Sequence, residues 1–140
     1  MNPEPAITLI RRYYEQALTH ADWATLDAIT TPAFVEHEIL PSIPPTVAGL
    51  KQKYDLLRTG FPDLTFVVED ILTASDRVAV RVTVRGTHTG MFMGRPATGR
   101  TFAVTSVSIF RLEADRIVEH WGVFDQMAML AQLGAFPGAA

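Results

Sequence analysis

The spacing of apolar residues changes once along this chain, and the change divides it into a helical part and a strand part. Up to Pro62, apolar residues recur every three or four positions, the period of an amphipathic helix. Beyond Pro62 they alternate with other residues, the period of a strand. The alternation is clearest at Val78, Val80, Val82 and Val84. Helices followed by successive antiparallel strands predict an α+β fold.

Three helices are predicted before the change of period. The first includes Tyr14 among its apolar positions. Asp22 and Thr46 are favoured N-cap residues and are expected to begin the second and third helices. Gly60 suits the C-terminal end of the third helix, and Pro62 prevents its continuation.

The rest of the chain reads as strands, one glycine-rich loop and a last helix. The expected strands span residues 64–72, 78–88, 100–112 and 117–125, the loop spans 89–99, and the helix spans 126–133. No linker or internal repeat interrupts the chain, so residues 1–140 are expected to form a single domain.

Composition excludes several classes of function. A net charge of −3 argues against nucleic acid or an anionic membrane as the main partner. The absence of cysteine excludes disulfides, thiolate catalysis and cysteine-ligated metals. No apolar run approaches the roughly 18 residues of a membrane span, and the N-terminus lacks a signal-peptide pattern. A cytoplasmic protein is therefore expected.

The strand expected around residues 101–111 carries apolar side chains on both faces. They are Phe102, Val104 and Phe110 on one face and Ala103, Val107 and Ile109 on the other. A sheet with one face on helices and one in water should alternate more cleanly. The outer face is therefore expected to form a homodimer interface, the alternative being scattered exposed apolar residues.

Asp125 is a carboxylate at the end of an apolar strand. Strand periodicity places it on one face with Trp121, where loss of hydration would raise its pKa and suit it to proton transfer near neutral pH. The alternative is that Asp125 caps the helix that follows it. The residue pattern leaves both interpretations open.

A set of short motifs, in order along almost the whole chain, resembles the SnoaL-like polyketide cyclase family of the nuclear-transport-factor-2-like (NTF2-like) superfamily. The motifs are FPDL at 61–64, DRVAVR at 76–81, RGTHTG at 85–90, PATGR at 96–100, SIFR at 108–111, IVEHW at 117–121 and LAQLG at 130–134. The resemblance implies an NTF2-like cone, in which a curved antiparallel sheet wraps around N-terminal helices and encloses an apolar pocket.

The resemblance also implies site residues. Family members that cyclise polyketides use an acid/base aspartate near the end of the last strand, the position of Asp125 here. The family tends to have one histidine after the second helix, matched by His37, and one in the Gly-Thr-His motif, matched by His88.

Strand parity orients the remaining candidates. His88 is in register with the valines of its strand, so it should point inward, where it could bind a substrate carbonyl. Its alternative role is to hold the loop 89–99 in place. Trp121 shares the face of Asp125 and should form a pocket wall, whereas His120 should face outward unless a bulge shifts the register.

Three further residues, His37, Phe92 and Tyr14, complete the predicted substrate-binding set. Phe92 belongs to an apolar stretch in the loop 89–99 that could form a flexible lip over the pocket. The histidines of the chain lack a close-spaced ligand pair, so no metal site is expected.

These observations predict a cofactor-independent enzyme acting on a small, largely apolar carbonyl compound. Asp125 would act as general acid/base, and the enolate would close a ring by intramolecular aldol addition or be isomerised, with His88 stabilising its oxygen. One alternative is a hydratase or epoxide hydrolase in which Asp125 activates water. Another is a small-molecule-binding module without turnover.

Overall fold

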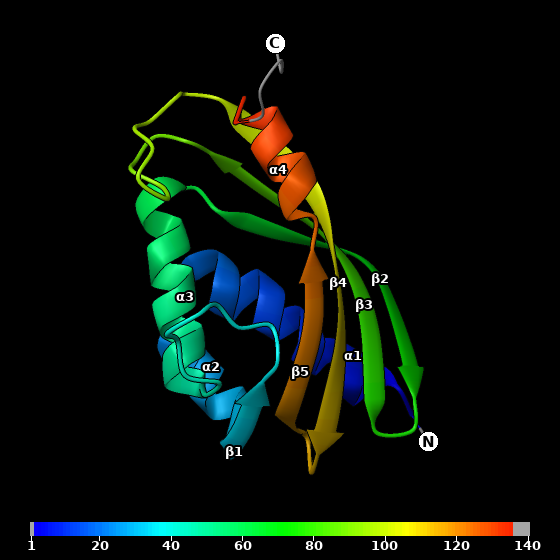
Figure 1. Ribbon diagram of the computed structural model, residues 1–140. Coiled ribbons are helices and arrows are strands. Elements are labelled where there is room, and N and C mark those ends of the chain that lie inside the picture. The colour runs from blue at the N-terminus through cyan, green and yellow to red at the C-terminus, as the bar shows by residue number, and fades with distance from the viewer. Residues whose placement is uncertain (1, 136–140) are drawn as a thin grey trace.

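A curved five-stranded sheet wraps around the N-terminal helices (Figure 1). The computed structural model describes residues 2–135. Its helices are α1 (Glu4–Arg11), the π-helical segment η1 (Arg12–Leu18), α2 (Trp23–Ile29), α3 (Val47–Gly60) and α4 (Gln126–Gln132). Its strands are β1 (Thr30–Glu36), β2 (Thr65–Ala74), β3 (Arg77–Thr87), β4 (Thr101–Glu113) and β5 (Arg116–Phe124). No helix within 2–135 is long and apolar enough to cross a bilayer.

The sheet has the strand order β1-β5-β4-β3-β2. Strands β2 to β5 are antiparallel neighbours and confirm the four strands expected from alternation. Strand β1, an edge strand parallel to β5, was not predicted from the sequence. Its proline, Pro32, and its sparse apolar residues hid it, and a proline within a sheet is tolerated at an edge.

The expected helix caps are present. Asp22 accepts a hydrogen bond from the Thr25 amide, and Thr46 accepts one from the Gly49 amide. Each cap satisfies one amide that the first helical turn leaves without an intrahelical partner. The sequence therefore fixes where α2 and α3 begin.

The core lies between the inner face of the sheet and the helices. The alternating valines of β3 are buried, and Phe110 of β4 packs edge-on against Tyr13 and Tyr14 of η1. Each fully buried side chain of this size stabilises the fold by about 1.5–3 kcal/mol. This packing holds η1 against β4 beside the cavity described below.

A bulge in β5 decides which of its side chains face the core. Arg111 pairs with Glu119, but Leu112 pairs with Ile117, so Val118 is an extra residue in β5. Beyond this bulge the parity is reversed: His120 is buried and faces the inner side, while Trp121 lies on the outer side. The parity predictions for both residues were therefore wrong.

Candidate active site

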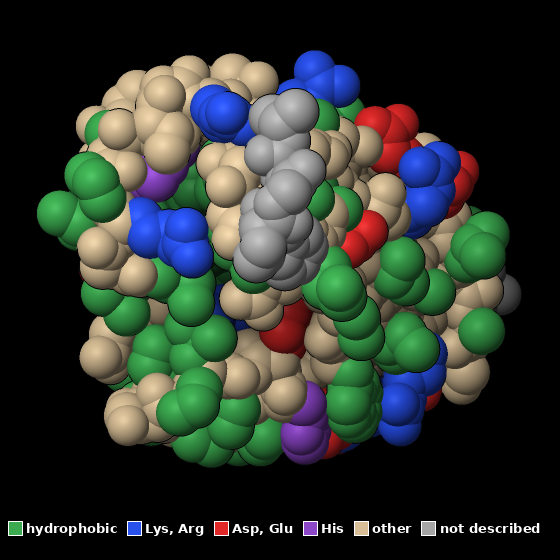
Figure 2. Space-filling view, turned by 45° about the horizontal axis from the view of Figure 1, so that its top comes forward, with side chains coloured by type: hydrophobic (Ala, Val, Ile, Leu, Met, Phe, Trp, Pro, Cys, Tyr) green, Lys and Arg blue, Asp and Glu red, His purple; other side chains and the backbone are tan. Residues whose placement is uncertain are grey.

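A cavity of about 430 Å³ lies between α3, the inner faces of β4 and β5, and the start of α4. Its volume falls within the range of small-molecule sites, roughly 300–1,000 Å³. Most of its wall is apolar, formed by residues such as Leu57, Phe66, Val84, Phe102, Phe124 and Met129. Figure 2 shows a hollow in this side of the molecule, bordered by apolar side chains, with an acidic group in its depth.

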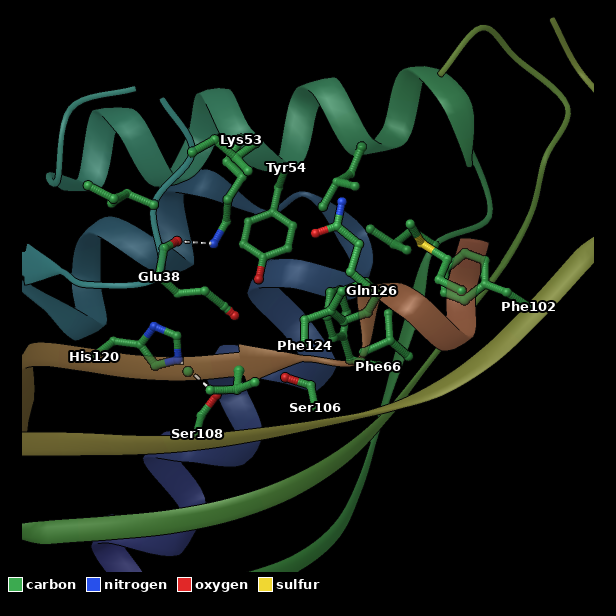
Figure 3. A pocket seen from close by; sticks show the side chains of 18 of the residues that line it. Glu38, Lys53, Tyr54, Phe66, Phe102, Ser106, Ser108, His120, Phe124 and Gln126 are labelled. Carbon is green, nitrogen blue, oxygen red and sulfur yellow. Dashed lines mark hydrogen bonds between the residues drawn. The ribbon is translucent and has the colours of Figure 1, made fainter. Parts of the chain in front are cut away.

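The polar groups of the cavity gather toward one end of it (Figure 3). They come from η1, the segment after β1, α3, β4 and β5, and they are Tyr14, Glu38, Lys53, Tyr54, Ser106, Ser108 and His120. One further polar side chain, Gln126 at the start of α4, lies beside Phe124 (Figure 3). An apolar cavity with a few convergent polar groups is the usual form of a ligand or active site.

His120 is the centre of a buried hydrogen-bonded chain. Its Nδ1 lies 2.6 Å from Glu36 Oε1, and its Nε2 lies 2.9 Å from Ser108 Oγ. Glu36 Oε1 also accepts from the Glu38 amide at 2.9 Å. In the tautomer in which Nδ1 donates to Glu36, Nε2 accepts from the Ser108 hydroxyl.

Two tyrosine hydroxyls border the same end of the cavity. Tyr14 of η1 lines this end together with Ser108 of β4. Burial raises the pKa of both Tyr14 and Tyr54, and the charge of Glu38 raises the pKa of Tyr54 further. Both hydroxyls therefore keep their proton at neutral pH and are able to donate hydrogen bonds.

Glu38 places a second carboxylate beside this chain. Both of its oxygens lie 3.0 Å from the point that a Cβ on Gly122 would occupy, and Ser108 Oγ lies 2.9 Å from that point. No described residue forms a hydrogen bond or ion pair with the Glu38 carboxylate. The buried Lys53 donates to the backbone oxygen of Glu38 at 2.8 Å and lies 5.0 Å from the Tyr54 ring centroid.

Two polar groups of the cavity, the Glu38 carboxylate and the Tyr54 hydroxyl, are free to bind a ligand. Within residues 2–135, neither the Glu38 carboxylate nor the Tyr54 hydroxyl has a hydrogen-bond partner, and both residues line the cavity (Figure 3). A carboxylate without a donor is free to accept a proton, and a free hydroxyl can donate to an oxygen. Together they can serve a ligand that has both an acidic C–H and a carbonyl oxygen.

Asp125 lies outside this arrangement. It is exposed, does not line the cavity, and its side chain accepts from the Ala128 amide as the N-cap of α4. The helix-cap interpretation is confirmed, and the expected burial of Asp125 was wrong. Its neighbour Phe124 points into the cavity, which directs Asp125 to the other side. The role of Asp125 in proton transfer stays a prediction. It was based on an expected burial that the structure does not have.

His88 is buried as expected but does not line the main cavity. Its Nδ1 lies 3.0 Å from Thr98 Oγ1, and its backbone pairs with Arg100 and Gly99 at the base of the loop 89–99. These contacts support the alternative interpretation, in which His88 holds this loop. It lines a second cavity instead.

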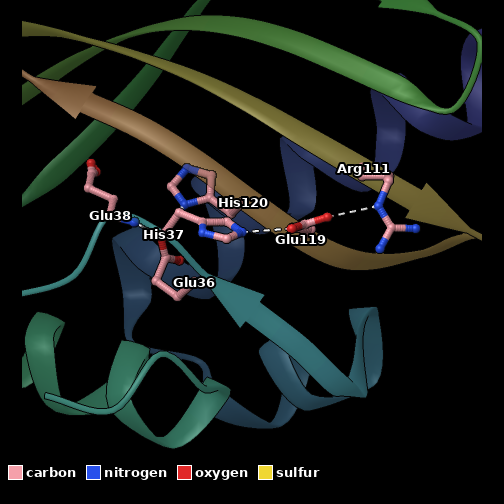
Figure 4. Close-up of polar contacts among 6 residues, drawn as sticks. All are labelled: Glu36, His37, Glu38, Arg111, Glu119 and His120. Atoms are coloured by element: carbon pink, nitrogen blue, oxygen red, sulfur yellow. Dashed lines mark hydrogen bonds and ion pairs between the residues drawn. The ribbon is translucent and has the colours of Figure 1, made fainter.

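His37 and Trp121 also lie outside the cavity, contrary to expectation. Their rings stack with centroids 4.9 Å apart, and His37 Nε2 lies 2.7 Å from Glu119, which in turn accepts from Arg111 at 2.9 Å (Figure 4). The Arg77 guanidinium also lies over the Trp121 ring, with its Cζ 4.9 Å from the ring centroid. Trp121 lies outside the cavity because the bulge in β5 moves its side chain to the outer face of the sheet.

The two other predicted binding residues, Tyr14 and Phe92, do line the cavity. Glu36, Glu38 and Tyr54 were not predicted as site residues from the sequence. A signal for the two glutamates existed: in an extended segment, residues 34, 36 and 38 share a face, and Phe34 is apolar. Recognising that signal required recognising β1 as a strand.

Comparisons with known proteins agree with this architecture. The family model described as SnoaL-like polyketide cyclase matches residues 8–133. IdmH from Streptomyces antibioticus, for which polyketide cyclisation has been put forward, is 37% identical with a TM-score of 0.83, over 94% of this chain and 99% of IdmH.

Two further solved structures share the fold. TsrD from Streptomyces laurentii is 24% identical with a TM-score of 0.85, over 97% of this chain and 99% of TsrD. AclR from Streptomyces galilaeus, for which hydroxylation has been put forward, is 26% identical with a TM-score of 0.77, over 98% of this chain and 83% of AclR. The comparison with curated proteins gave no match.

Proposed function

Since this chain belongs to the SnoaL-like polyketide cyclase family and has its NTF2-like fold, we propose that it catalyses acid–base chemistry on a small, largely apolar carbonyl compound. The reaction removes a proton from a carbon next to a carbonyl group. The enolate then closes a ring by intramolecular aldol addition or is reprotonated elsewhere as an isomerisation. No cofactor is needed for either outcome.

The observation that carries the proposal is the unpaired Glu38 carboxylate beside the unpaired Tyr54 hydroxyl in an apolar cavity. A substrate carbonyl oxygen would accept from Tyr54, with the neighbouring C–H against Glu38. Glu38 takes the proton as the enolate forms, and the Tyr54 hydroxyl stabilises the negative oxygen. After ring closure, the new alkoxide takes the proton back from Glu38, which restores the enzyme.

This assignment replaces Asp125 and His88 by residues that line the cavity. The Asp125 carboxylate is exposed and already accepts from a helix amide, so it has neither the location nor the low-polarity surroundings for the role. Glu36 is not among the described residues that line the cavity, and its hydrogen-bonded chain through His120 to Ser108 suits it to fixing the shape of the polar end rather than to taking a proton from substrate.

A second candidate is the hydration or epoxide-opening reaction, in which a carboxylate activates water. The polar cluster of Glu38, Ser108 and His120 supports it, because such reactions need several polar groups around the water. Incorporation of oxygen from isotopically labelled water into product would favour this reaction, and cyclisation or isomerisation would show none.

Exchange of carbon-bound protons tests the proposal without the natural substrate. β-Tetralone is a small apolar ketone with acidic protons next to its carbonyl, and nuclear magnetic resonance (NMR) in deuterated water follows their loss. The wild-type protein should accelerate the exchange. Glu38→Gln should lower the rate by about a hundredfold or more, the low end for a general base, and Tyr54→Phe by about a hundredfold, as for one oxyanion donor.

Asp125→Asn is the matched control, because it also changes a carboxylate to an amide and should leave the exchange rate unaltered. Binding of β-tetralone without exchange would indicate a non-catalytic binding module. Exchange that survives Glu38→Gln but is lost in Asp125→Asn would return the role to Asp125.

A further inference from the structure

A second cavity, of about 380 Å³, lies between the end of α4 and the loop 88–98. Phe92 and Met93 line both cavities and separate them. Leu130 and Leu133 of α4 form the rest of the apolar wall, and the polar side chains that line it include His88 and Arg95. The proposed carbonyl chemistry uses none of the residues of this cavity.

His88 contributes a buried ring nitrogen without a partner. The side chain is 1% exposed, and no described residue hydrogen-bonds to Nε2. Thr98 Oγ1 accepts from the Arg100 amide at 3.2 Å and lies 3.0 Å from His88 Nδ1. In the tautomer in which Thr98 donates to Nδ1, the ring proton of His88 is on Nε2, and such a buried donor is costly to leave unsatisfied.

The wall of this cavity is also positively charged. Arg95 is exposed, and no carboxylate within residues 2–135 pairs with it. None of the lining residues that the structure describes is acidic. A donor and a positive charge together favour an anionic acceptor.

We propose that this second cavity binds an amphiphilic carboxylate, a short hydrocarbon chain ending in a carboxylate group. The carboxylate accepts from His88 Nε2 and pairs with Arg95. The hydrocarbon chain packs against Leu130, Leu133 and Phe92. This site is separate from the carbonyl site and stands whether or not the protein catalyses proton exchange.

Hexanoate and its uncharged analogue hexanamide test the proposal by NMR titration of the isotopically labelled full chain. Hexanoate should shift the amide signals of Thr98, Leu130 and Gly134, and hexanamide should bind at least about tenfold more weakly, because a hydrogen bond to a charged group is worth more than one to a neutral group.

Arg95→Gln should weaken hexanoate binding by about tenfold through loss of its charge. Arg116→Gln, which removes the same charge from an exposed position at the start of β5, is the matched control and should change nothing. His88→Gln should weaken hexanoate binding similarly. If His88→Gln does not fold, Arg95→Gln still tests the proposal, because Arg95 is exposed and its substitution should not disturb the fold.

Equal affinity for hexanoate and hexanamide would overturn the proposal, as would unchanged binding in Arg95→Gln. Shifts confined to Ser108, His120 and Gly122 would overturn it too, since they would place the ligand in the main cavity. The titration reads binding alone, so its failure and a failure of the proton-exchange assay are separate results.

Discussion

At Gly122 the missing side chain leaves the space in which Glu38 lies beside Ser108. A Cβ at this position would lie 2.9 Å from Ser108 Oγ and 3.0 Å from each Glu38 carboxylate oxygen. All three atoms are side-chain atoms, so a methyl group would move them without disturbing the backbone. The position of the proposed base therefore depends on a residue that contributes no functional group.

Gly122→Ala is expected to displace the Glu38 carboxylate while the fold is kept. β-Tetralone exchange should fall by about tenfold or more, because a shift on the order of 1 Å in a catalytic group is enough to lose that much rate. In a Glu38→Gln background the same substitution should have little further effect. Equal losses in both backgrounds would show that Gly122 acts independently of Glu38.

Asp125 provides a prediction about stability at the same scale. Asp125→Ala should lower the free energy of unfolding by about 1 kcal/mol, because α4 loses its N-cap. Asp125→Asn should leave stability nearly unchanged, since Asn also caps well. Urea denaturation of the two variants measures the difference, and equal stability of both would contradict the cap assignment.

Among the elements, the edge strand β1 does most to assemble the site. It pairs with β5, with Glu36 opposite His120. Glu36 points inward to His120, while the next residue, His37, lies on the outside against Glu119 (Figure 4). The His37 ring also stacks on Trp121. The contacts of His37 on the outer side therefore help to hold β1, the strand that places Glu36 against His120.

The ion pairs of Glu119 predict a pH dependence of stability. The hydrogen bond with His37, followed by that with Arg111, lowers the pKa of Glu119 below the ordinary value of a glutamate. A carboxyl group whose pKa is lower in the folded state stabilises the fold above its unfolded pKa, and this contribution is lost as pH falls through the folded pKa. Wild type should therefore lose stability toward acid more steeply than Glu119→Gln.

Urea midpoints measured from neutral to acidic pH would test this difference. It should be largest near neutral pH and disappear at the acidic end of the series. Glu4→Gln, a substitution at an exposed carboxylate in α1, is the control and should parallel wild type. Parallel curves for wild type and Glu119→Gln would contradict the prediction.

For the whole molecule, the outer face of the sheet has an apolar strip at β4 and β5. Val107 is 50% exposed and Ile109 43% exposed, and Ile109 pairs across the strands with Trp121. The alternation expected for β4 is confirmed, with Phe102, Val104 and Phe110 on the buried side. Apolar residues next to one another on an exposed face are typical of an interaction surface.

We expect the chain to form a homodimer through this outer face. Val107→Glu and Ile109→Glu should shift the protein toward monomer in sedimentation experiments, because each would bury an unpaired charge at the interface. Met127→Glu is the matched control, since Met127 is 70% exposed but lies on α4. A wild type that sediments only as monomer at micromolar concentration would contradict the expectation.

The sequence by itself determined the features set by local periodicity and local hydrogen bonds. Alternation located β2 to β5, and the caps Asp22 and Thr46 located α2 and α3. Ordered motifs also identified the family, which the match over residues 8–133 shows. These features depend on residues close together in the chain, so a single sequence contains them.

The candidate site was decided by tertiary structure. One extra residue, Val118, reversed the parity of β5, so His120 rather than Trp121 lines the cavity. This bulge depends on the pairing of β5 with β4, which no local pattern in the sequence specifies. Glu36 became the partner of His120, 84 positions away, because β1 adds to the edge of the sheet beside β5. Such long-range pairings depend on how the elements pack, which is why the sequence identified the family but assigned the wrong carboxylate to the cavity.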